Sequence, residues 1–293
     1  MRALGLLFPS LYLVFLLSRA SIAGELSLIV SPESREVFQG EVLVISVSGE
    51  GLSGVNGLLR GREVPFFPSS GSGSYRALLG VDLAEKPGPV KFAIRTSGKG
   101  EKRVPVVLRI KKKNFSTERL SVSAAFDRFD ETTLKRIHRE KERLTRLWSV
   151  SSRQRWWRGR FIVPVPGGIT SPFGLRRIIN GSPRSPHGGV DLKAPQGAEV
   201  LAPNHGRVIV RDQFFFSGKS IVLDHGGGLY TMYFHLSDFR AEKGSQVRKG
   251  EVIGLVGMTG RVTGPHLHWG ARLNGARVDP FELSEGVWEE RQP

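Results

Sequence analysis

The stretch Pro183-Arg-Ser-Pro-His187-Gly-Gly-Val-Asp191 constrains how the C-terminal part of this 293-residue chain folds. On an ideal strand the Cα atoms of His187 and Asp191 would lie about 13 Å apart, too far to share an ion held about 2 Å from each donor. A regular helix would align the two side chains, but the Gly188-Gly189 pair disfavours a helix and permits a bend. We therefore expect His187 in a loop and Asp191 at the start of a strand.

A second pair of candidate site residues lies in His266-Leu267-His268. Residues two apart on a strand face the same side at about 6.6 Å, so both rings can reach one site. One imidazole can bind a metal ion directly, while the other transfers protons or stabilises developing negative charge. Spacing alone leaves the assignment open. Together with the first stretch, the pair favours a site of two histidines and one carboxylate, which suits zinc with a water in the fourth position.

The remaining histidines have different surroundings. His235 lies in a mixed apolar and polar segment typical of a strand that ends at a pocket, and a buried structural histidine fits this context equally well. His205 and His225 lie in turn sequences, so we expect both at the surface. His138 lies within a basic segment and is expected to be solvated. We include none of these last three in the site.

Around these motifs, residues 161–285 alternate glycine and proline turns with valine-rich runs, which predicts an all-β domain. A weak internal repeat relates Gly197-Ala-Glu-Val200 and Gly206-Arg-Val208 to Gly244-Ser-Gln-Val247 and Gly250-Glu-Val252. Two related β-hairpins would explain this repeat. The last residues, 286–293, are expected to form a tail.

The N-terminal part has its own pattern. Five short runs separated by Gly, Ser and Pro clusters predict a small antiparallel sandwich of immunoglobulin type over residues 24–113, namely Leu26–Val30, Val42–Val47, Tyr75–Leu79, Val90–Ile94 and Val104–Ile110. Residues 114–160 are expected to form a basic helical linker. Within it, Asp130 is placed to cap a helix over residues 131–148.

Composition restricts the chemistry and the compartment. The chain has no cysteine, which excludes disulfides, a thiolate nucleophile and Cys-ligated zinc. Residues 1–23 read as a secretory signal, with Arg2, an apolar stretch and a small-x-small cleavage site ending at Ala23. Because the apolar run is shorter than the roughly 20 residues of a membrane span, a retained anchor is the less favoured alternative. We expect an exported protein of the periplasm or cell envelope.

The charge is concentrated in the N-terminal half. The whole chain carries 43 Lys and Arg against 27 Asp and Glu, a formal charge of +16. Residues 161–293 hold 15 basic and 12 acidic residues, so most of the excess lies upstream. Such an excess usually indicates nucleic acid, but export makes an anionic envelope surface the expected partner.

Five segments carry a family resemblance, because their residues agree in both order and spacing: Ser171-Pro-Phe-Gly174-Leu-Arg176, Pro183 to Asp191, Ala202-Pro-Asn-His-Gly206, Tyr233-Phe-His235-Leu236 and Thr263-Gly-Pro-His266-Leu-His268-Trp269-Gly270. In these segments the chain resembles the M23 (lysostaphin-like, LytM-type) zinc metallopeptidases that cut peptidoglycan peptides. The resemblance covers about residues 161–283.

The resemblance implies a C-terminal two-sheet antiparallel β domain of lysostaphin-like, duplicated hybrid motif type. It also implies a zinc endopeptidase that hydrolyses peptide cross-links of peptidoglycan with a zinc-activated water. By the family's motifs, His187, Asp191 and His268 would hold Zn²⁺. His235 and His266 would transfer protons and stabilise the oxyanion.

Two alternatives to this activity remain. Some relatives have lost ligands and act as noncatalytic LytM-type activators of cell-wall amidases, a function that the five intact positions disfavour. A D-Ala-D-Ala carboxypeptidase-type zinc site also combines His, Asp and His, but its first two ligands lie farther apart in sequence than His187 and Asp191.

Overall fold

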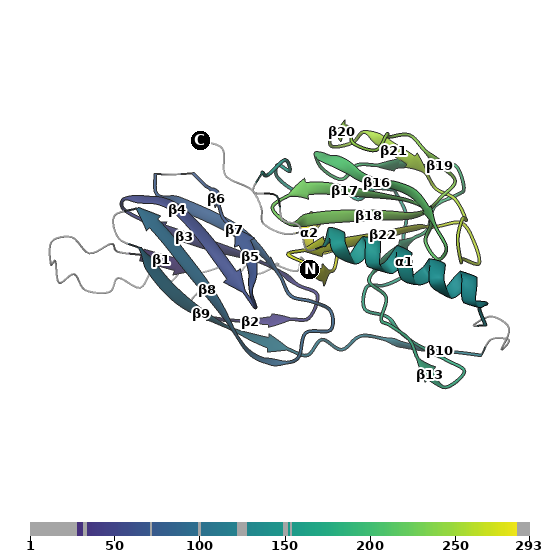
Figure 1. The fold of residues 1–293 in the computed structure, drawn as a ribbon, viewed down its shortest axis with the longest axis horizontal. Coiled ribbons are helices and arrows are strands. Elements are labelled where there is room, and N and C mark those ends of the chain that lie inside the picture. The colour runs from purple at the N-terminus through teal and green to yellow at the C-terminus, as the bar shows by residue number, and fades with distance from the viewer. Residues whose placement is uncertain are drawn as a thin grey trace, which may run out of the picture.

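The computed structural model describes residues 28–31, 34–70, 72–98, 101–121, 128–148, 152 and 154–285. The expected signal peptide and C-terminal tail lie outside the described residues. Figure 1 shows a β-sandwich, a connection that contains one long helix, and a second β-rich domain. The described chain is mainly β, as expected. None of its described helices is both long and apolar enough to cross a membrane.

Nine strands form the N-terminal sandwich, and their bounds are β1 (Leu28–Ser31), β2 (Ser34–Phe38), β3 (Val42–Gly49), β4 (Leu52–Leu59), β5 (Arg62–Pro65), β6 (Phe67–Pro68), β7 (Ser74–Gly80), β8 (Gly88–Gly98) and β9 (Lys102–Lys111). One sheet has the order β1-β3-β7-β6 and the other β2-β9-β8-β4-β5. Strands β1, β3, β7, β8 and β9 overlap the five runs predicted from sequence. The sandwich is not wholly antiparallel, because β2 pairs with β9 in parallel.

Alternation along the strands builds the core of the sandwich. On β8 the side chains of Phe92 and Ile94 are fully buried, and on β9 Leu108 is 1% exposed, while the residues between them face outward. Successive side chains of a strand point to opposite faces, so one face of each sheet supplies the apolar surface that folding removes from water.

The connection between the two β domains contains a strand and a helix. Strand β10 (Thr117–Leu120) pairs in parallel with β12 (Arg176–Ile179) of the C-terminal part. Helix α1 (Glu131–Leu147) begins after Asp130, whose Oδ1 accepts a hydrogen bond from Thr133 N at 2.8 Å. The helix expected over residues 131–148 is therefore present with its expected cap. Sequence does not predict the strand that ties the linker to the second domain.

The remaining elements form the C-terminal domain, with the bounds β11 (Ile169–Ser171), β12 (Arg176–Ile179), β13 (Ser182–Pro183), β14 (Gly189–Leu192), β15 (Glu199–Leu201), β16 (Gly206–Phe214), β17 (Gly218–Gly226), β18 (Leu229–Leu236), β19 (Asp238–Phe239), β20 (Gln246–Val247), β21 (Val252–Leu255), β22 (Leu267–Leu273), β23 (Ala276–Val278) and α2 (Phe281–Glu285). The large sheet has the order β11-β14-β22-β18-β17-β16-β20, with β23 beside β22, and a second sheet has the order β15-β21-β19. Between the sheets lies a core that includes the fully buried Tyr233 and Trp269.

The internal repeat folds differently from the expected pair of hairpins. Strand β15 of the first copy pairs with β21 of the second, and β16 of the first pairs with β20 of the second. Each copy therefore completes the other across the two sheets, and the hairpin prediction is wrong. These short strands gain partners by this exchange and bury Val200, Val247 and Ile253 in the core.

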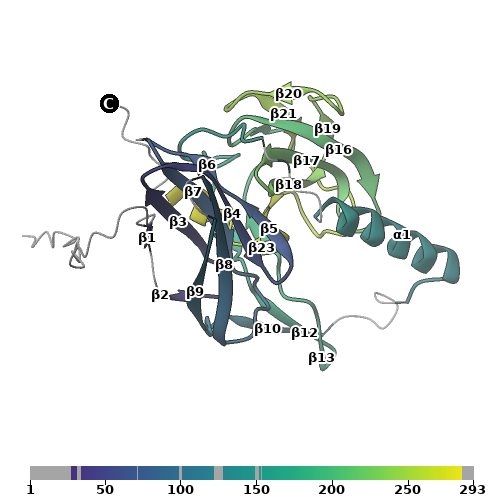
Figure 2. The ribbon, with the colours of Figure 1, turned by 60° about the vertical axis from the view of Figure 1, so that its left-hand side comes forward.

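The sandwich packs directly against the C-terminal domain, as Figure 2 also shows. Strand β7 contacts β22 and β23. Gly80 at the end of β7 leaves no room for a side chain, because a Cβ there would lie 2.8 Å from the carbonyl oxygen of Leu273. Val42 of the sandwich joins an apolar cluster with Phe161 and Leu273. The two domains thus share buried surface.

Candidate active site

The centre of the candidate site is a pair of residues on adjacent antiparallel strands. Asp191 on β14 lies directly opposite His268 on β22. Directly opposite residues project to the same face, so the two side chains meet. Asp191 Oδ1 and His268 Nδ1 are 2.9 Å apart. Asp191 lies in a strand, as expected from sequence, but the strand begins two residues before it, at Gly189, instead of at Asp191 itself.

The third donor comes from the loop before β14. The backbone of His187 is fixed by a hydrogen bond from its N–H to the carbonyl of Leu175, 2.9 Å away. On the ring, Nδ1–H donates to the carbonyl of Pro172 at 3.0 Å. This bond sets the tautomer and leaves the lone pair of Nε2 directed at the site. His187 Nε2 lies 3.1 Å from Asp191 Oδ1 and 3.0 Å from His268 Nδ1.

These three donors fit a divalent metal ion. Their ligand atoms all lie within 4.8 Å of one another, and the closest atoms are 2.9 to 3.1 Å apart. Four donors held about 2.0 Å from a tetrahedral zinc lie about 3.3 Å apart, so small movements would accommodate the ion. Two imidazole nitrogens and one carboxylate oxygen are also the donor types of open, hydrolytic zinc sites.

The protonation preferences of the donors agree with metal binding. Burial raises the pKa of Asp191, but hydrogen bonds and charge from His187 and His268 outweigh burial and hold this pKa well below its usual range. Burial is also the largest cause that lowers the pKa of His268. A deprotonated carboxylate and a neutral imidazole are the forms that bind metal.

His235 reaches the site through an unusual backbone conformation. It lies near the end of β18 with φ of +65°, a left-handed conformation that is uncommon for a residue with a side chain. A change from regular strand geometry here re-aims the ring, whose centroid lies 5.0 Å from that of His266. Nδ1–H of His235 donates to the carbonyl of Thr259 at 2.9 Å, so Nε2 is free to accept a proton. Burial, the largest cause, lowers the pKa of His235 to about 4.

His266 has a matching hydrogen-bond arrangement. Its Nδ1–H donates to the carbonyl of Gly264 at 2.9 Å, and its Nε2 lies 3.8 Å from Asp191 Oδ1. The structure thus brings all five expected site residues together. Two imidazole Nε2 atoms with free lone pairs lie beside a cluster of three metal-type donors, which is an arrangement suited to proton transfer next to an activated water.

The surface placement expected for His225 is wrong. His225 is fully buried, with Nδ1–H donating to the carbonyl of His205 and Nε2 accepting from Thr231, both at 2.7 Å. Tyr233 in turn lies 2.6 Å from Thr231 Oγ1. The glycine-rich sequence after His225 predicts a turn, but His225 itself belongs to β17 (Gly218–Gly226) and points into the core. Both ring nitrogens have hydrogen-bond partners, which compensate for the loss of solvent contact. His205 is half-buried, and His138 is exposed, as expected.

Several supporting residues carried no signal in the sequence. Phe234 stacks on His268 with ring centroids 5.2 Å apart and an interplanar angle of 4°. The carbonyls of Pro172, Thr259 and Gly264 orient the three histidines, and backbone carbonyls have no residue-type signature. Phe234 of β18 is the register partner of His268 on β22, so the two side chains lie on the same face of the sheet.

Comparison with known proteins identifies the family. The peptidase family M23 profile matches residues 185–280. A crystal structure from Pseudomonas aeruginosa assigned to peptidase M23 superposes with a TM-score of 0.68 and 31% identity, covering 85% of this chain and 96% of the other. The chain therefore belongs to peptidase family M23.

Curated relatives match over the C-terminal domain. The DD-carboxypeptidase/endopeptidase Mpg of Neisseria meningitidis is 43% identical over 116 residues, which are 40% of this chain and 27% of that protein. The peptidoglycan DD-endopeptidase ShyA of Vibrio cholerae is 38% identical over 126 residues, 43% of this chain and 29% of that protein. The match thus spans less than a third of either relative's length.

Proposed function

We propose that this protein is a zinc-dependent endopeptidase that hydrolyses the peptide cross-links of bacterial peptidoglycan. The observation that carries the proposal is the convergence of His187, Asp191 and His268 beside the two imidazoles of His235 and His266. Peptidase family membership and the DD-endopeptidase names of relatives support the reaction and the substrate class.

The proposed mechanism assigns each residue a task. His187, Asp191 and His268 hold the zinc ion, which when bound supplies Lewis-acid polarisation of a carbonyl and lowers the pKa of a water. Either His235 or His266 accepts the proton of the attacking water at Nε2. The imidazolium so formed donates to the departing amine, and the other ring lies beside the developing oxyanion. Hydrogen bonds to Thr259 and Gly264 keep both Nε2 atoms available.

Digestion of purified sacculi tests this proposal. We expect the mature protein to release new amino groups, chelator to abolish the release, and added zinc to restore it. His187→Ala and His266→Ala variants should each lose activity, whereas His138→Ala, a change on the exposed face of α1, should retain it. Equal release by all four proteins would exclude the zinc mechanism.

An inactive wild type would point to a different role. If the protein releases nothing but stimulates a cell-wall amidase, it is an activator rather than a hydrolase. The intact set of five side chains favours the hydrolase, because an activator needs no imidazoles beside three metal ligands.

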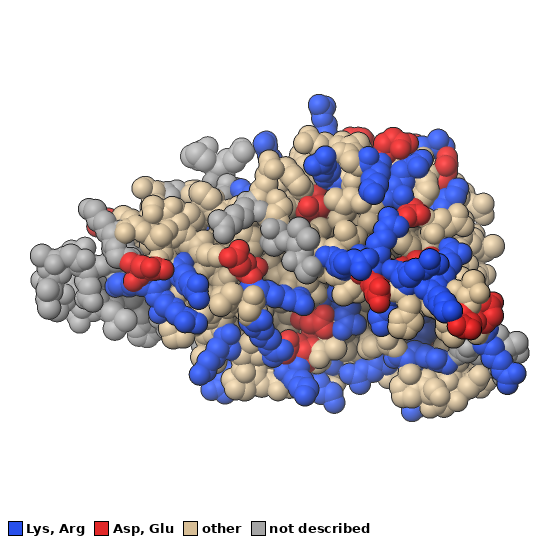
Figure 3. All heavy atoms as spheres, viewed as in Figure 1, with Lys and Arg blue, Asp and Glu red and all other residues tan. Residues whose placement is uncertain are grey.

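We also infer that the basic N-terminal half holds the exported enzyme near an anionic envelope surface. In Figure 3 Lys and Arg side chains spread along the lower edge of the sandwich and across the face that carries α1. Exposed charges are screened within about 8 to 10 Å at physiological salt, so binding to sacculi or anionic vesicles should weaken as salt rises. Binding that does not change with salt would contradict this inference.

A further inference from the structure

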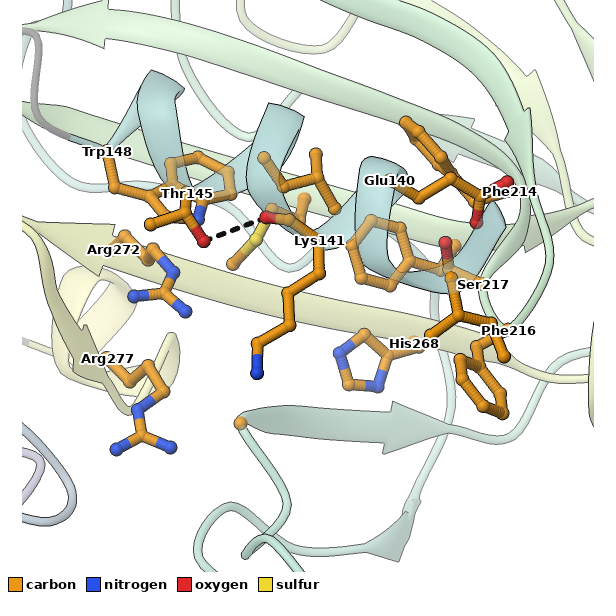
Figure 4. A pocket seen from close by; sticks show the side chains of 15 residues that line it. Glu140, Lys141, Thr145, Trp148, Phe214, Phe216, Ser217, His268, Arg272 and Arg277 are labelled. Atoms are coloured by element: carbon orange, nitrogen blue, oxygen red, sulfur yellow. Dashed lines mark hydrogen bonds between the residues drawn. The ribbon is translucent and has the colours of Figure 1, made fainter. Parts of the chain in front are cut away.

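A groove leads from His268 along the outer face of the large sheet and beneath helix α1. Its cavity volume is about 410 Å³. Apolar side chains of the floor and the helix wall include Met232, Phe234 and Leu144. Glu140 of the helix also lines the groove, and its carboxylate accepts hydrogen bonds from Arg136 Nε and Phe215 N. Lys141, Arg272 and Arg277 also line the groove, and Figure 4 shows the Lys141 side chain extending from α1 toward the space between His268 and the two arginines. The groove therefore joins the candidate metal site to a cluster of cations.

Strand β22 sets the distance between the two ends. His268, Gly270 and Arg272 follow one another on the same face of the strand. Their register partners on β18 are Phe234, Met232 and Tyr230. At about 3.3 Å per residue, the Cα atoms of His268 and Arg272 lie about 13 Å apart. Gly270 has no side chain of its own, and the Met232 side chain covers this position, because a Cβ on Gly270 would lie 2.8 Å from Met232 Cε. A peptide lying extended on this face would span the distance with about four residues.

Arg272 is a half-buried cation with incomplete partners. Its Nε is buried and lacks a hydrogen-bond partner in the structure, while Nη1 donates to the carbonyl of Gly275 at 3.1 Å. The guanidinium lies 5.0 Å from the ring centroid of Trp148. Burial, followed by the charge of Arg277, lowers the pKa of Arg272 to about 10. A buried guanidinium without a matching carboxylate is costly, and a bound anion would offset that cost.

The charges around Arg272 are unbalanced. Arg62 and Arg277 also act on it, and Asp82 is the carboxylate that opposes them. Asp82 is already engaged by Arg277, with Oδ1 2.7 Å from Nη2. Within the described parts of the chain, no carboxylate forms an ion pair with Lys141 or Arg272. The basic end of the groove can therefore accept one more anionic group.

We propose that Arg272 and Lys141 bind a carboxylate of the peptide substrate at this basic end, about four extended residues from the bond that is cut. The proposal rests on the proposed peptidase function, since it assigns the groove to that substrate. The apolar floor receives the aliphatic portion of the chain, and the cations select its free carboxylate over a neutral amide. Helix α1, which lies outside the segment matched by the family profile, supplies Lys141 and so completes the subsite.

Matched substrates test the subsite. Cross-linked muropeptide dimers released from sacculi are compared with the same dimers after carbodiimide amidation of their carboxylates. We expect the full-length wild type to cleave the acid form with a kcat/KM about tenfold higher, because hydrogen bonds to charged groups are strong. Lys141→Gln and Arg272→Met should each reduce this preference severalfold.

The control variant is Lys135→Gln, which changes the same helix at an exposed lysine paired with Glu131. It should keep the wild-type preference. Lys141 is exposed, so its variant stays informative even if Arg272→Met fails to fold. An equal preference for the acid dimer in wild type and Lys141→Gln would overturn the subsite while leaving the peptidase function intact.

Binding without cleavage separates the two proposals. With chelator present, titration of the full chain with the acid dimer should change the fluorescence of Trp148, since this ring lies against Arg272. Trp148→Phe should lose the change and identify its source. If neither dimer is cleaved by the zinc-loaded protein, but the acid dimer gives a saturable change that Lys141→Gln weakens, the peptidase function fails and the subsite stands. No carboxylate-dependent change would overturn the subsite.

Discussion

Asp82 of the N-terminal sandwich and Arg277 of β23 form a bidentate ion pair between the two domains. Asp82 Oδ1 lies 2.7 Å from Arg277 Nη2, and Oδ2 lies 3.2 Å from Nε. Burial raises the pKa of Asp82, but hydrogen bonds from Arg277 and Ala84 outweigh it and hold this pKa below its usual value. The pair fixes the sandwich beside the strand that follows β22.

Asp82→Ala should destabilise this domain contact. The change leaves Arg277 without its carboxylate, and a hydrogen bond to a charged group contributes about 2 kcal/mol. We expect a lower midpoint of thermal unfolding, measured by circular dichroism. Glu36→Gln is the control, because Glu36 forms an exposed pair with Lys111 whose loss should have little effect. Equal midpoints for Asp82→Ala and the control would contradict the structural role of the pair.

The same carboxylate has a predictable pH dependence. Its pKa is lower in the folded than in the unfolded state, so the stabilisation is fully present above about 3.8 and is lost as pH falls through the lower folded value. The free energies of unfolding of wild type and Asp82→Ala should therefore converge at acidic pH. Urea titrations at several pH values measure this, and a constant difference down to the lowest pH would contradict it.

His225 should make the fold sensitive to mild acid. Burial is the largest cause that lowers its pKa from 6.5 to about 4. Between these values the unfolded state binds more protons, so stability is full above 6.5 and falls as pH decreases toward 4, by about 3 kcal/mol from this group. His225→Asn, which keeps a donor toward the carbonyl of His205, should show a shallower loss. His138→Asn, an exposed control, should follow the wild-type curve.

Two adjacent glycines should respond differently to alanine. A Cβ on Gly189 would lie 2.5 Å from the carbonyl oxygen of Trp269 and 2.8 Å from His268 Nε2, so the backbone or the ring must move. A Cβ on Gly188 would meet its nearest atom, Arg277 Cδ, at 3.7 Å. Gly189→Ala should therefore weaken zinc binding severalfold in a chelator competition assay and cost about 1 to 3 kcal/mol of stability. Gly188→Ala should be close to wild type on both measures.

The same glycines show what the sequence could predict. Residue spacing placed His187 in a loop and Asp191 in a strand, because only a bend could bring them together. The structure satisfies that need without left-handed backbone at either glycine, since neither Gly188 nor Gly189 has a positive φ. Gly189 is required for close approach of β22, which depends on strand pairing and leaves no local trace in the sequence.

The remainder of the site depends on long-range packing. The two-residue spacing of His266 and His268 predicted that both rings share one face of a strand. The left-handed conformation of His235 and the carbonyl that orients its ring were found only in the structure. Helix α1 was predicted by its cap and periodicity. Its position over the groove was not predicted, because the contacts of Leu144 and Trp148 with the sheet join residues far apart in sequence.

The fate of cross-linked dimers in purified sacculi tests the central proposal most directly. After incubation with zinc-loaded protein, mass spectrometry of the released muropeptides should show dimers converted to monomers by addition of water, while glycan strands retain their peptides. Asp191→Asn should leave the dimers intact. Unchanged dimers, or stem peptides freed from glycan by the wild type, would contradict a zinc endopeptidase that cuts peptide cross-links.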